Sequence, residues 1–345
     1  MKEILLIGGI AGDKPIIGGE TGKNASLIAT LRDCRRKVIP VSLLQLHQHP
    51  WRGFVALCKL VAHPNANVII SSSLKRSGWL IKLLHKTKSK RNICYIGTGC
   101  EFSGIIARGE FRADYFRNVS SIIVQGESMK KELATVGLDA IVLPNFKQMD
   151  YLPKLPERAT DGVVKFVFMS RMNEKKGVNM IIDCVHKLNQ YGFDGKFSVD
   201  FYGAFEDKAY QKEIMKSISC MPNVKFKGIL NLCEHDGYET LAKYTVMLFP
   251  TFWPGEGFPG VLIDAMMAGL PVIASDWHFN SDIIEEGKTG IIIPNQNEEA
   301  LYLAMKDVIE NSQKYLEMAE CCQQRTKEYD TKNVINEEFL SKIKM

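Results

Sequence analysis

The sequence predicts an α/β protein of two doubly wound domains, and three observations carry this prediction. The chain has 345 residues, which is too long for one ordinary core and suits two domains. In both halves, short apolar segments of strand length alternate with amphipathic segments of helix length. Apolar strands separated by helices indicate parallel sheets that are covered on both faces. We therefore expect ligands to bind at the carboxyl ends of the strands.

The expected strands follow one another in regular order. Those of the first half are EILLIG, KVIPVSL, NVIISSS, NICYIG, SIIVQG and AIVLPN, and those of the second half are KFVFMS, FSVDFYG, VKFKG, TVMLFP, LPVIAS and GIIIP. Residues 143–162 hold prolines and charges with little apolar periodicity, as is typical of a linker. We expect domains over residues 1–150 and 160–325, with a C-terminal helix over residues 326–345 that packs back on the first domain.

Composition is that of an ordinary globular protein, with 46% hydrophobic and 24% charged residues. No stretch approaches 18 uncharged apolar residues, so we expect no transmembrane helix. The first apolar run ends in Gly-Gly, which favours a buried strand over a signal peptide. Nine scattered cysteines form no C-x-x-C pair, which favours small buried side chains in a reducing cytosol over metal or disulfide sites.

The charge is unevenly distributed along the chain. Residues 1–150 carry 22 Lys and Arg against 11 Asp and Glu, whereas residues 151–345 carry 22 against 28. This asymmetry suggests that the first domain faces something anionic. Residues 73–92 read as a basic amphipathic helix, which suits either contact with anionic membrane lipid or a core helix with a solvated basic face. Residues 52–63 are a second such candidate, and we expect no nucleic-acid partner.

Two glycine-rich segments near the N-terminus resemble nucleotide loops only in part. In GGETGKN, residues 18–24, three residues rather than four separate the glycines, and Asn24 replaces the hydroxyl that would hold magnesium. IGGIAG, residues 7–12, lacks the spacing of a dinucleotide fingerprint. What remains is a glycine loop after the first strand, whose backbone can approach a phosphate closely.

Two segments of the second half carry candidate chemistry. SRMNEKKG, residues 170–177, places Arg171 and Lys176 between a strand end and a helix start, where a diphosphate would be held by both side chains and the helix dipole. The alternative is a pair of solvated surface cations. PTFWPGEGFPGVLIDAMMAG, residues 250–269, places Glu256 in a loop and Asp264 in the helix that follows, with Gly269 as its stop. The alternative is a capping acid and a satisfied helical acid.

These two motifs, in this order and about 80 residues apart, resemble the donor-binding signature of retaining GT-B glycosyltransferases of the GT4 type. SSIIVQGESMKKELATVGLDAIVLPN and EEGKTGIIIP resemble further segments of that family. The resemblance covers about residues 1–325 and is stronger after residue 160. It implies a GT-B fold, in which two Rossmann-like domains face each other across a cleft, and transfer of a sugar from a nucleotide-sugar donor, with UDP favoured over GDP.

The resemblance also implies roles for single residues. Arg171 and Lys176 would hold the donor diphosphate and stabilise the leaving nucleotide, and Glu256 would contact hydroxyls of the transferred sugar. Asp264 would bind the ribose, and the loop near Leu230 would contact the base. The backbone lining the sugar would come from Phe258, Pro259, Gly260 and Val261, and Gly19 would close over the phosphates.

The sequence departs from the family pattern at two places. Asp264 replaces the usual Glu and is one methylene shorter, so its helix must lie closer to the ribose or a water must intervene. The stretch CYIGTGCEF lacks the His that many members carry near the sugar, and Thr98 or Glu101 could occupy that space. There is no Asp-x-Asp, which favours metal-free stabilisation of the leaving group by the two cations. We therefore expect no metal and no further cofactor.

The acceptor implied by the resemblance is a glycan or a polyprenyl-diphosphate-linked glycan, bound by the first domain. The opening of the donor motif, PTFWPGEGFPG, resembles enzymes of capsule, exopolysaccharide and O-antigen synthesis, which implies a cytoplasmic enzyme peripheral to the inner face of the plasma membrane. Two alternatives stay open. A GT-B nucleotide-sugar epimerase would need a dense set of acid and base groups, and a non-catalytic sugar- or lipid-binding relative would bind the donor without turnover.

Overall fold

The structure is a computed structural model that describes residues 3–11, 19–99, 101–155, 162–232 and 234–345. It divides into two compact units, of which unit 1 comprises Met1–Gln148 and Glu328–Met345 and unit 2 comprises Met149–Lys327. The expectation of a phosphate loop rests largely on residues 12–18, which lie outside the described residues, as do Cys100, residues 156–161 of the expected linker and Cys233. Within the described part of the chain, no helix is long and apolar enough to cross a membrane.

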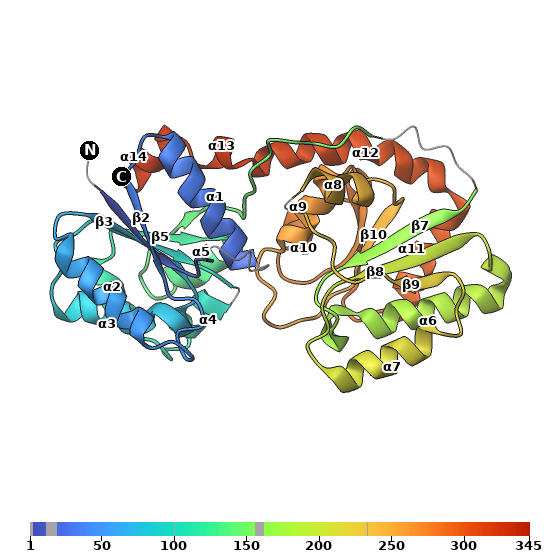
Figure 1. Cartoon of the computed structure of the whole chain (residues 1–345), viewed down its shortest axis with the longest axis horizontal. Helices are drawn as coiled ribbons and strands as arrows, with labels where there is room; N and C mark the ends of the chain where they lie inside the picture. Colours follow the sequence, from blue (N-terminus) through green and yellow to red (C-terminus); the bar gives the residue numbers. More distant parts are fainter. Residues whose placement is uncertain (1–2, 12–18, 100, 156–161, 233) are drawn as a thin grey trace. The chain divides into compact units, whose positions relative to one another are not determined.

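Unit 1 is built on a six-stranded parallel sheet with the strand order β2-β1-β3-β4-β5-β6. The strands are β1 (Ile4–Gly8), β2 (Val38–Ser42), β3 (Asn67–Ser72), β4 (Ile93–Gly97), β5 (Ser121–Val124) and β6 (Ile141–Val142). The helices between them are α1 (Gly19–Asp33), α2 (Trp51–Ala62), α3 (Leu74–Lys86), α4 (Glu101–Ala107), the 3-10 helix η1 (Ala113–Asn118) and α5 (Glu127–Ala134). Figure 1 shows α1 on one face of this sheet and α2 and α3 together on the other.

The C-terminal segment belongs to unit 1. It forms the short helices α13 (Thr331–Val334) and α14 (Glu337–Lys342) rather than one continuous helix, because Ile335 leaves the helical conformation between them. Ile335, Phe339 and Leu340 are buried in the same cluster as α1 and the inner strands. Leu143 and Phe146, from the expected linker, are also part of this core, and the chain passes into unit 2 only after Gln148.

Unit 2 is built on a second six-stranded parallel sheet with the order β12-β11-β10-β7-β8-β9. The strands are β7 (Val164–Met169), β8 (Phe197–Tyr202), β9 (Val224–Phe226), β10 (Val246–Phe249), β11 (Val272–Ser275) and β12 (Gly290–Ile293). The helical segments are η2 (Glu174–Lys176), α6 (Val178–Leu188), η3 (Asn189–Phe193), α7 (Lys208–Ile218), α8 (His235–Leu241), α9 (Gly260–Met267), α10 (Asn280–Ile283), α11 (Glu298–Glu310), α12 (Ser312–Thr326) and η4 (Lys327–Tyr329), the last of which leads back into unit 1.

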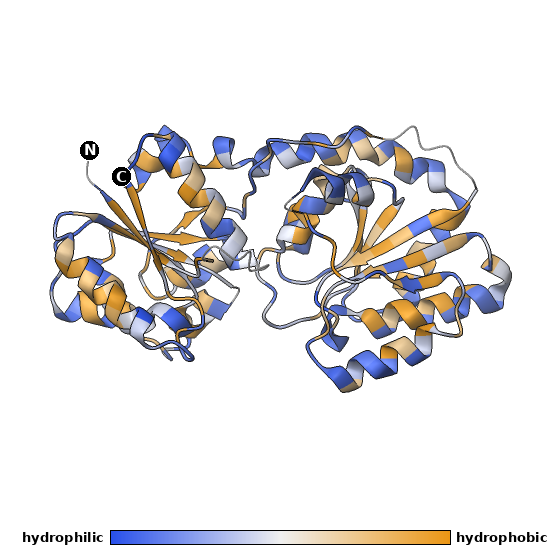
Figure 2. Cartoon of the chain, in the orientation of Figure 1, coloured by the Kyte–Doolittle hydropathy of each residue, from blue (hydrophilic) through white to orange (hydrophobic). Residues whose placement is uncertain are grey.

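Apolar residues follow the strands in both units, as Figure 2 shows, and the inner strands are buried on both faces. This is why they read as continuous apolar runs rather than as alternating ones. In each sheet the order reverses beside the first strand, between β1 and β3 in unit 1 and between β7 and β10 in unit 2. Ligands of doubly wound sheets bind outside the carboxyl ends of the strands at such a reversal.

Candidate functional site

The two sequence motifs of the second half meet at the reversal point of unit 2. SRMNEKKG follows β7, and the glycine- and proline-rich loop of residues 250–259 follows β10, the neighbouring strand. The backbone N–H of Phe252 donates to the Lys175 carbonyl at 2.8 Å. Gly177 has a φ of 81°, and a side chain on it would overlap the Pro250 carbonyl. The two loops therefore pack directly on each other, and Gly177 permits this close approach.

Lys176 and Glu256 form a buried ion pair between these loops. The Lys176 ammonium contacts Glu256 Oε2, and the two side chains are only 4% and 12% exposed. Thr251, fully buried, donates from Oγ1 to the same carboxylate oxygen at 3.0 Å. Burial lowers the pKa of Lys176 below its usual value, and the Glu256 carboxylate opposes that change. The chain thus holds a partly dehydrated cation beside a carboxylate at a sheet edge that suits ligand binding.

Arg171 lies in the same loop but is half exposed. Its Nη1 is 2.6 Å from Glu206 Oε1, and Asn173 Nδ2 donates to the other oxygen of that carboxylate at 3.0 Å. The Arg171 guanidinium also lies 5.3 Å from the ring centre of Trp253, in the loop after β10. Two cations beside the start of α6 are unfavourable unless anions accompany them. The structure supplies one carboxylate to each cation, Glu206 to Arg171 and Glu256 to Lys176.

Asp264 lies on α9 and is 5% exposed, and Tyr238 on α8 donates its hydroxyl to Asp264 Oδ1 at 2.7 Å. Leu230 lies half-buried in the segment between β9 and α8. The next residue, Asn231, packs closely against Gly237 of α8, and a side chain on Gly237 would overlap the Asn231 carbonyl. The segment near Leu230 is therefore packed onto the helix that carries Tyr238, and so belongs to the surroundings of Asp264.

The four backbone positions expected to line the sugar open α9. Phe258 and Pro259 are buried, and the Phe258 ring stacks on that of Phe279 with centres 6.0 Å apart. Gly260 and Val261 are half-buried, and Gly260 is the first residue of the helix. Gly269 follows the helix with a φ of 69°, as a glycine stop should.

The remaining candidate residues belong to unit 1. Gly19 is exposed and opens α1, and Thr98 is half-buried just after β4. Glu101 opens α4 and forms an exposed ion pair with Lys75 at 2.8 Å. At the reversal point of unit 1, Asn24 Nδ2 donates to the carbonyls of Gly9 and Ser71 at 3.1 Å. The residue that stands where a phosphate loop has a hydroxyl thus ties backbone segments together.

The burial of Lys23, the residue before Asn24, was not expected from the sequence. Its side chain is 4% exposed, and its ammonium has no hydrogen-bond partner among the described residues. The nearest aromatic group is the Phe146 ring, 5.6 Å from Nζ to the ring centre. Burial lowers the pKa of Lys23 to about 8, although Glu20 acts in the opposite direction.

Sequence reasoning also missed Thr251 and Tyr238. Thr251 lies two residues after the end of β10, so its position close to a strand end was an available signal. Tyr238 offered none, because its contact with Asp264 depends on how α8 packs against α9.

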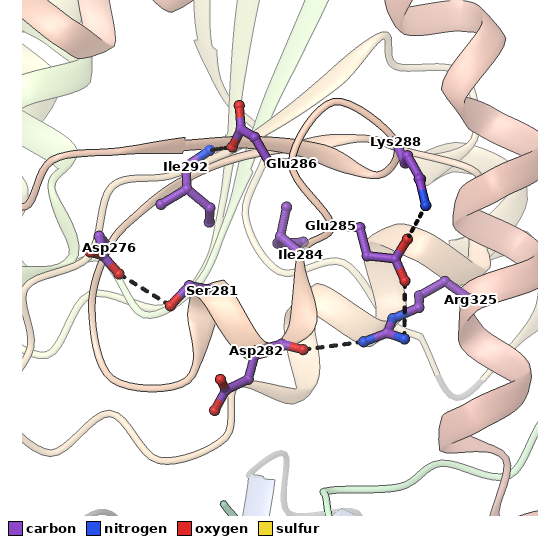
Figure 3. A pocket seen from close by; sticks show the side chains of 9 residues that line it. All are labelled: Asp276, Ser281, Asp282, Ile284, Glu285, Glu286, Lys288, Ile292 and Arg325. Atoms are coloured by element: carbon purple, nitrogen blue, oxygen red, sulfur yellow. Dashed lines mark hydrogen bonds and ion pairs between the residues drawn. The ribbon is translucent and has the colours of Figure 1, made fainter. Parts of the chain in front are cut away.

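A shallow acidic depression lies elsewhere in unit 2. Figure 3 shows its lining, in which Arg325 bridges Glu285 and the Asp282 carbonyl while Lys288 reaches Glu285. The full lining is Asp276, Ser281, Asp282, Ile284, Glu285, Glu286, Lys288, Ile292 and Arg325. It shares no residue with the two loops described above, and its four acids against two bases make it unsuited to a diphosphate.

Comparison with known proteins agrees with this architecture. Over its whole length the chain superposes on the whole of Anabaena HepE, solved in complex with UDP and glucose, with a TM-score of 0.73 at 16% identity. A sucrose-phosphate synthase from Thermosynechococcus elongatus gives the same TM-score at 14% identity, with 96% of each chain covered. These likenesses establish the GT-B fold.

Sequence relatives are fragmentary but consistent. The chain is 23% identical over 211 residues to a phosphatidyl-myo-inositol mannosyltransferase of Mycobacterium leprae, covering 60% of this chain and 54% of that protein. It is 28% identical over 142 residues to the amylovoran biosynthesis glycosyltransferase AmsK of Erwinia amylovora, covering 40% and 34%. The chain thus matches between about a third and just over half of the length of these curated relatives. A family model described as "Glycosyl transferases group 1" matches residues 156–328, half of the chain and nearly all of unit 2. The chain therefore belongs to the group 1 glycosyltransferases.

Proposed function

We propose that this protein is a retaining glycosyltransferase that transfers a sugar from a UDP-sugar to a glycan or a lipid-linked glycan. The observation that carries the proposal is the buried Lys176–Glu256 pair between two loops at the reversal point of unit 2, with Arg171 in the same loop. A cation held in a dry position stabilises developing negative charge more strongly than one in water. HepE, whose solved complexes contain UDP, UDP-glucose or UDP and glucose, supports UDP as the nucleotide.

The proposed reaction breaks the bond between the anomeric carbon and the donor phosphate oxygen, and the leaving nucleoside diphosphate takes the electron pair. Lys176 and Arg171 stabilise the charge that develops on the diphosphate. The acceptor hydroxyl forms the new bond on the face from which the nucleotide departs, and its proton passes to the departing phosphate oxygen. The two side chains supply the electrostatic stabilisation themselves, so we propose that no metal is needed.

The remaining site residues position the donor. In this proposal the Glu256 carboxylate, which contacts Lys176 and Thr251, accepts hydrogen bonds from sugar hydroxyls. Asp264, oriented by Tyr238, accepts from the ribose hydroxyls, and the segment at Leu230 contacts the base. The backbone from Phe258 to Val261 lines the sugar at the start of α9. From the family resemblance we further propose that Gly19 of unit 1 binds the phosphates and that Thr98 or Glu101 binds the transferred sugar.

We place the reaction in surface polysaccharide synthesis, on the cytoplasmic face of the plasma membrane. The names of AmsK and of the colanic acid biosynthesis protein WcaL of Escherichia coli, 23% identical over 150 residues, support this setting. The membrane contact expected from residues 73–92 is part of the proposal. In the structure the apolar side chains Leu80, Ile81 and Leu84 of this segment are buried, so it offers a membrane its cations but little apolar surface.

The test is turnover with a panel of UDP- and GDP-sugars in the presence of EDTA, with polyprenyl-diphosphate-linked and free glycans as acceptors. The anomeric configuration of the product is read by proton NMR. We expect transfer with retention from a UDP-sugar, and a drop in kcat of about a hundredfold or more for Lys176→Met. Lys187→Met is the matched control, because Lys187 forms a surface ion pair with Glu299.

Three outcomes would contradict the proposal. Inversion of the anomeric centre would exclude the same-face mechanism. Donor binding without transfer to any acceptor would favour a non-catalytic binding protein. Conversion of the nucleotide-sugar itself into an epimer would favour the epimerase alternative.

A further inference from the structure

Helix α2 presents an apolar stripe to solvent. Trp51, Phe54, Val55 and Val61 are 58%, 68%, 36% and 80% exposed, and Cys58 is exposed as well. Their spacing follows the helical repeat, so they lie along one side of α2. Half of the large hydrophobic side chains that are exposed in the described chain lie on this one helix of 12 residues.

The opposite side of α2 faces the protein. Ala56 is fully buried and Leu60 is 7% exposed, and a side chain on Gly53 would contact the Trp79 ring of α3 at 3.6 Å. The helix therefore carries apolar side chains on its outer side as well as on its inner side. An exposed apolar stripe on a surface helix usually marks an interaction surface, so the outer side of α2 lacks a partner.

The surroundings of the stripe are exclusively basic in sequence. Between Asp33 and Glu101 the chain contains 12 Lys and Arg and not one Asp or Glu, and α2 and α3 both lie in this stretch. Arg52 and Lys59 are on α2 itself. Arg91 donates to the carbonyls of Leu60 and His63 at 2.6 and 2.9 Å, which ties the lysine-rich turn after α3 to the end of α2. Lys86, Lys88 and Lys90 of this region are all exposed.

Four acids from outside the stretch pair with some of its basic residues. Glu3 lies 2.7 Å from His63 Nδ1 and pairs with Lys37 at 2.5 Å, Glu20 pairs with Arg76, Glu101 with Lys75 and Glu337 with Arg36. Arg52 and Lys59 of α2 are not among these paired residues, and neither are the lysines of the turn after α3, so the area around α2 keeps its positive character.

We propose that α2 docks on an anionic lipid bilayer, with its apolar stripe in the interface and the cations of α2 and of the turn after α3 at the headgroups. The inference deepens the membrane contact within the proposed function, on which it rests. It assigns the inserting surface to Trp51, Phe54, Val55, Cys58 and Val61 rather than to residues 73–92, whose apolar side is buried.

Charge selects this occupant over a second copy of the chain. In a two-fold dimer the same patch would face itself, so the basic surroundings of the stripe would meet their own like charges. An anionic bilayer instead offers apolar tails to the stripe and negative headgroups to the lysines. Trp51, with the Arg52 guanidinium 5.6 Å from its ring centre, has the amphipathic character favoured at such an interface.

The experiment measures binding of the full chain to vesicles of phosphatidylcholine alone and of phosphatidylcholine with phosphatidylglycerol, at low and high salt. Phe54→Glu tests the stripe and Lys59→Gln tests the cations. Leu303→Glu is the matched control, because Leu303 is a 53% exposed hydrophobic residue of α11 in unit 2. Sedimentation without vesicles reports the oligomeric state, and transfer to a water-soluble acceptor reports activity.

We expect the wild type to bind the anionic vesicles and to dissociate at high salt. Phe54→Glu lowers the partition coefficient by about tenfold or more, since one aromatic ring no longer inserts into the bilayer interface. Lys59→Gln lowers it by about fivefold, and Leu303→Glu leaves it unchanged. All three variants keep the soluble-acceptor activity, so a failure of docking is distinguishable from a failure of the proposed function.

Two results would overturn the inference. One is equal binding of wild type and Phe54→Glu to anionic vesicles, or no binding by either. The other is a wild-type dimer that Phe54→Glu converts to a monomer, which would assign the stripe to self-association.

Discussion

Replacing Lys23 by methionine should stabilise unit 1, because the wild-type chain buries an ammonium without a hydrogen-bond partner among the described residues. Burial lowers the pKa of Lys23 from 10.5 to about 8. At about 1.4 kcal/mol per pH unit, this difference corresponds to a cost of about 3.5 kcal/mol to the folded state at neutral pH. The Phe146 ring, 5.6 Å from Nζ, returns about 0.5–1 kcal/mol, so the net gain expected for Lys23→Met is about 2.5–3 kcal/mol.

The stability gained by Lys23→Met should depend on pH. Below pH 8 the lysine is charged in both the folded and the unfolded chain, so the full cost is present. Between pH 8 and 10.5 the folded chain has released the proton that the unfolded chain still binds, so the wild type gains stability as the pH rises. The advantage of Lys23→Met should therefore shrink across this range and vanish above it.

Urea unfolding of both proteins at pH 7 and at pH 10 measures this difference. Lys131→Met, at an exposed lysine of α5, serves as control and should change the free energy of unfolding by less than about 0.5 kcal/mol. If Lys23→Met is less stable than the wild type at pH 7, or if its advantage is the same at both pH values, the buried Lys23 charge does not destabilise the folded chain.

Two further predictions concern unit 2. In thermal unfolding, Gly177→Ala should destabilise the unit by at least about twice as much as Gly192→Ala. Both residues have positive φ, but only a side chain at Gly177 would overlap the Pro250 carbonyl. Equal effects would show that the two loops do not need this close approach. Tyr238→Phe should raise the Kd for UDP about tenfold in calorimetry, since it removes the hydrogen bond that orients Asp264, and an unchanged Kd would remove Asp264 from the ribose site.

Local features of the fold were predictable from the sequence. A helix was expected to start directly after SRMNEKKG, and α6 spans Val178–Leu188 at that place. Gly269 was expected to stop α9 and does so with a positive φ. Such boundaries are predictable because periodicity and glycine act over a few residues.

Contacts between distant residues were not predictable from local pattern. Lys176 and Glu256 meet only because the chain returns from the far edge of the sheet to place β10 beside β7, and periodicity does not specify strand order. The family resemblance implied that both segments bind the same ligand, but it did not imply an ion pair between Lys176 and Glu256. The burial of Lys23 was hidden for a similar reason, since a lysine in a glycine-rich segment normally indicates a solvated loop.

The helix α2 shows the converse case. Its composition was visible in the sequence, and residues 52–63 were a candidate for membrane contact beside residues 73–92. Which side of each helix is covered depends on the packing of α2 on α3, as in the approach of Gly53 to Trp79. Only the structure separates the segment that exposes apolar side chains from the one that buries them.

Thermal stabilisation of the purified protein by UDP, GDP and ADP in EDTA tests whether the loop after β7 holds a nucleoside diphosphate. We expect selective stabilisation by UDP, and a loss of about 1.5–3 kcal/mol of UDP binding in Arg171→Ala, the value of one charge-assisted contact. Arg108→Ala, which removes an exposed ion pair with Glu110 in unit 1, should bind UDP as the wild type does. Absence of stabilisation by all three nucleotides, or equal stabilisation of wild type and Arg171→Ala, would exclude diphosphate binding by this loop.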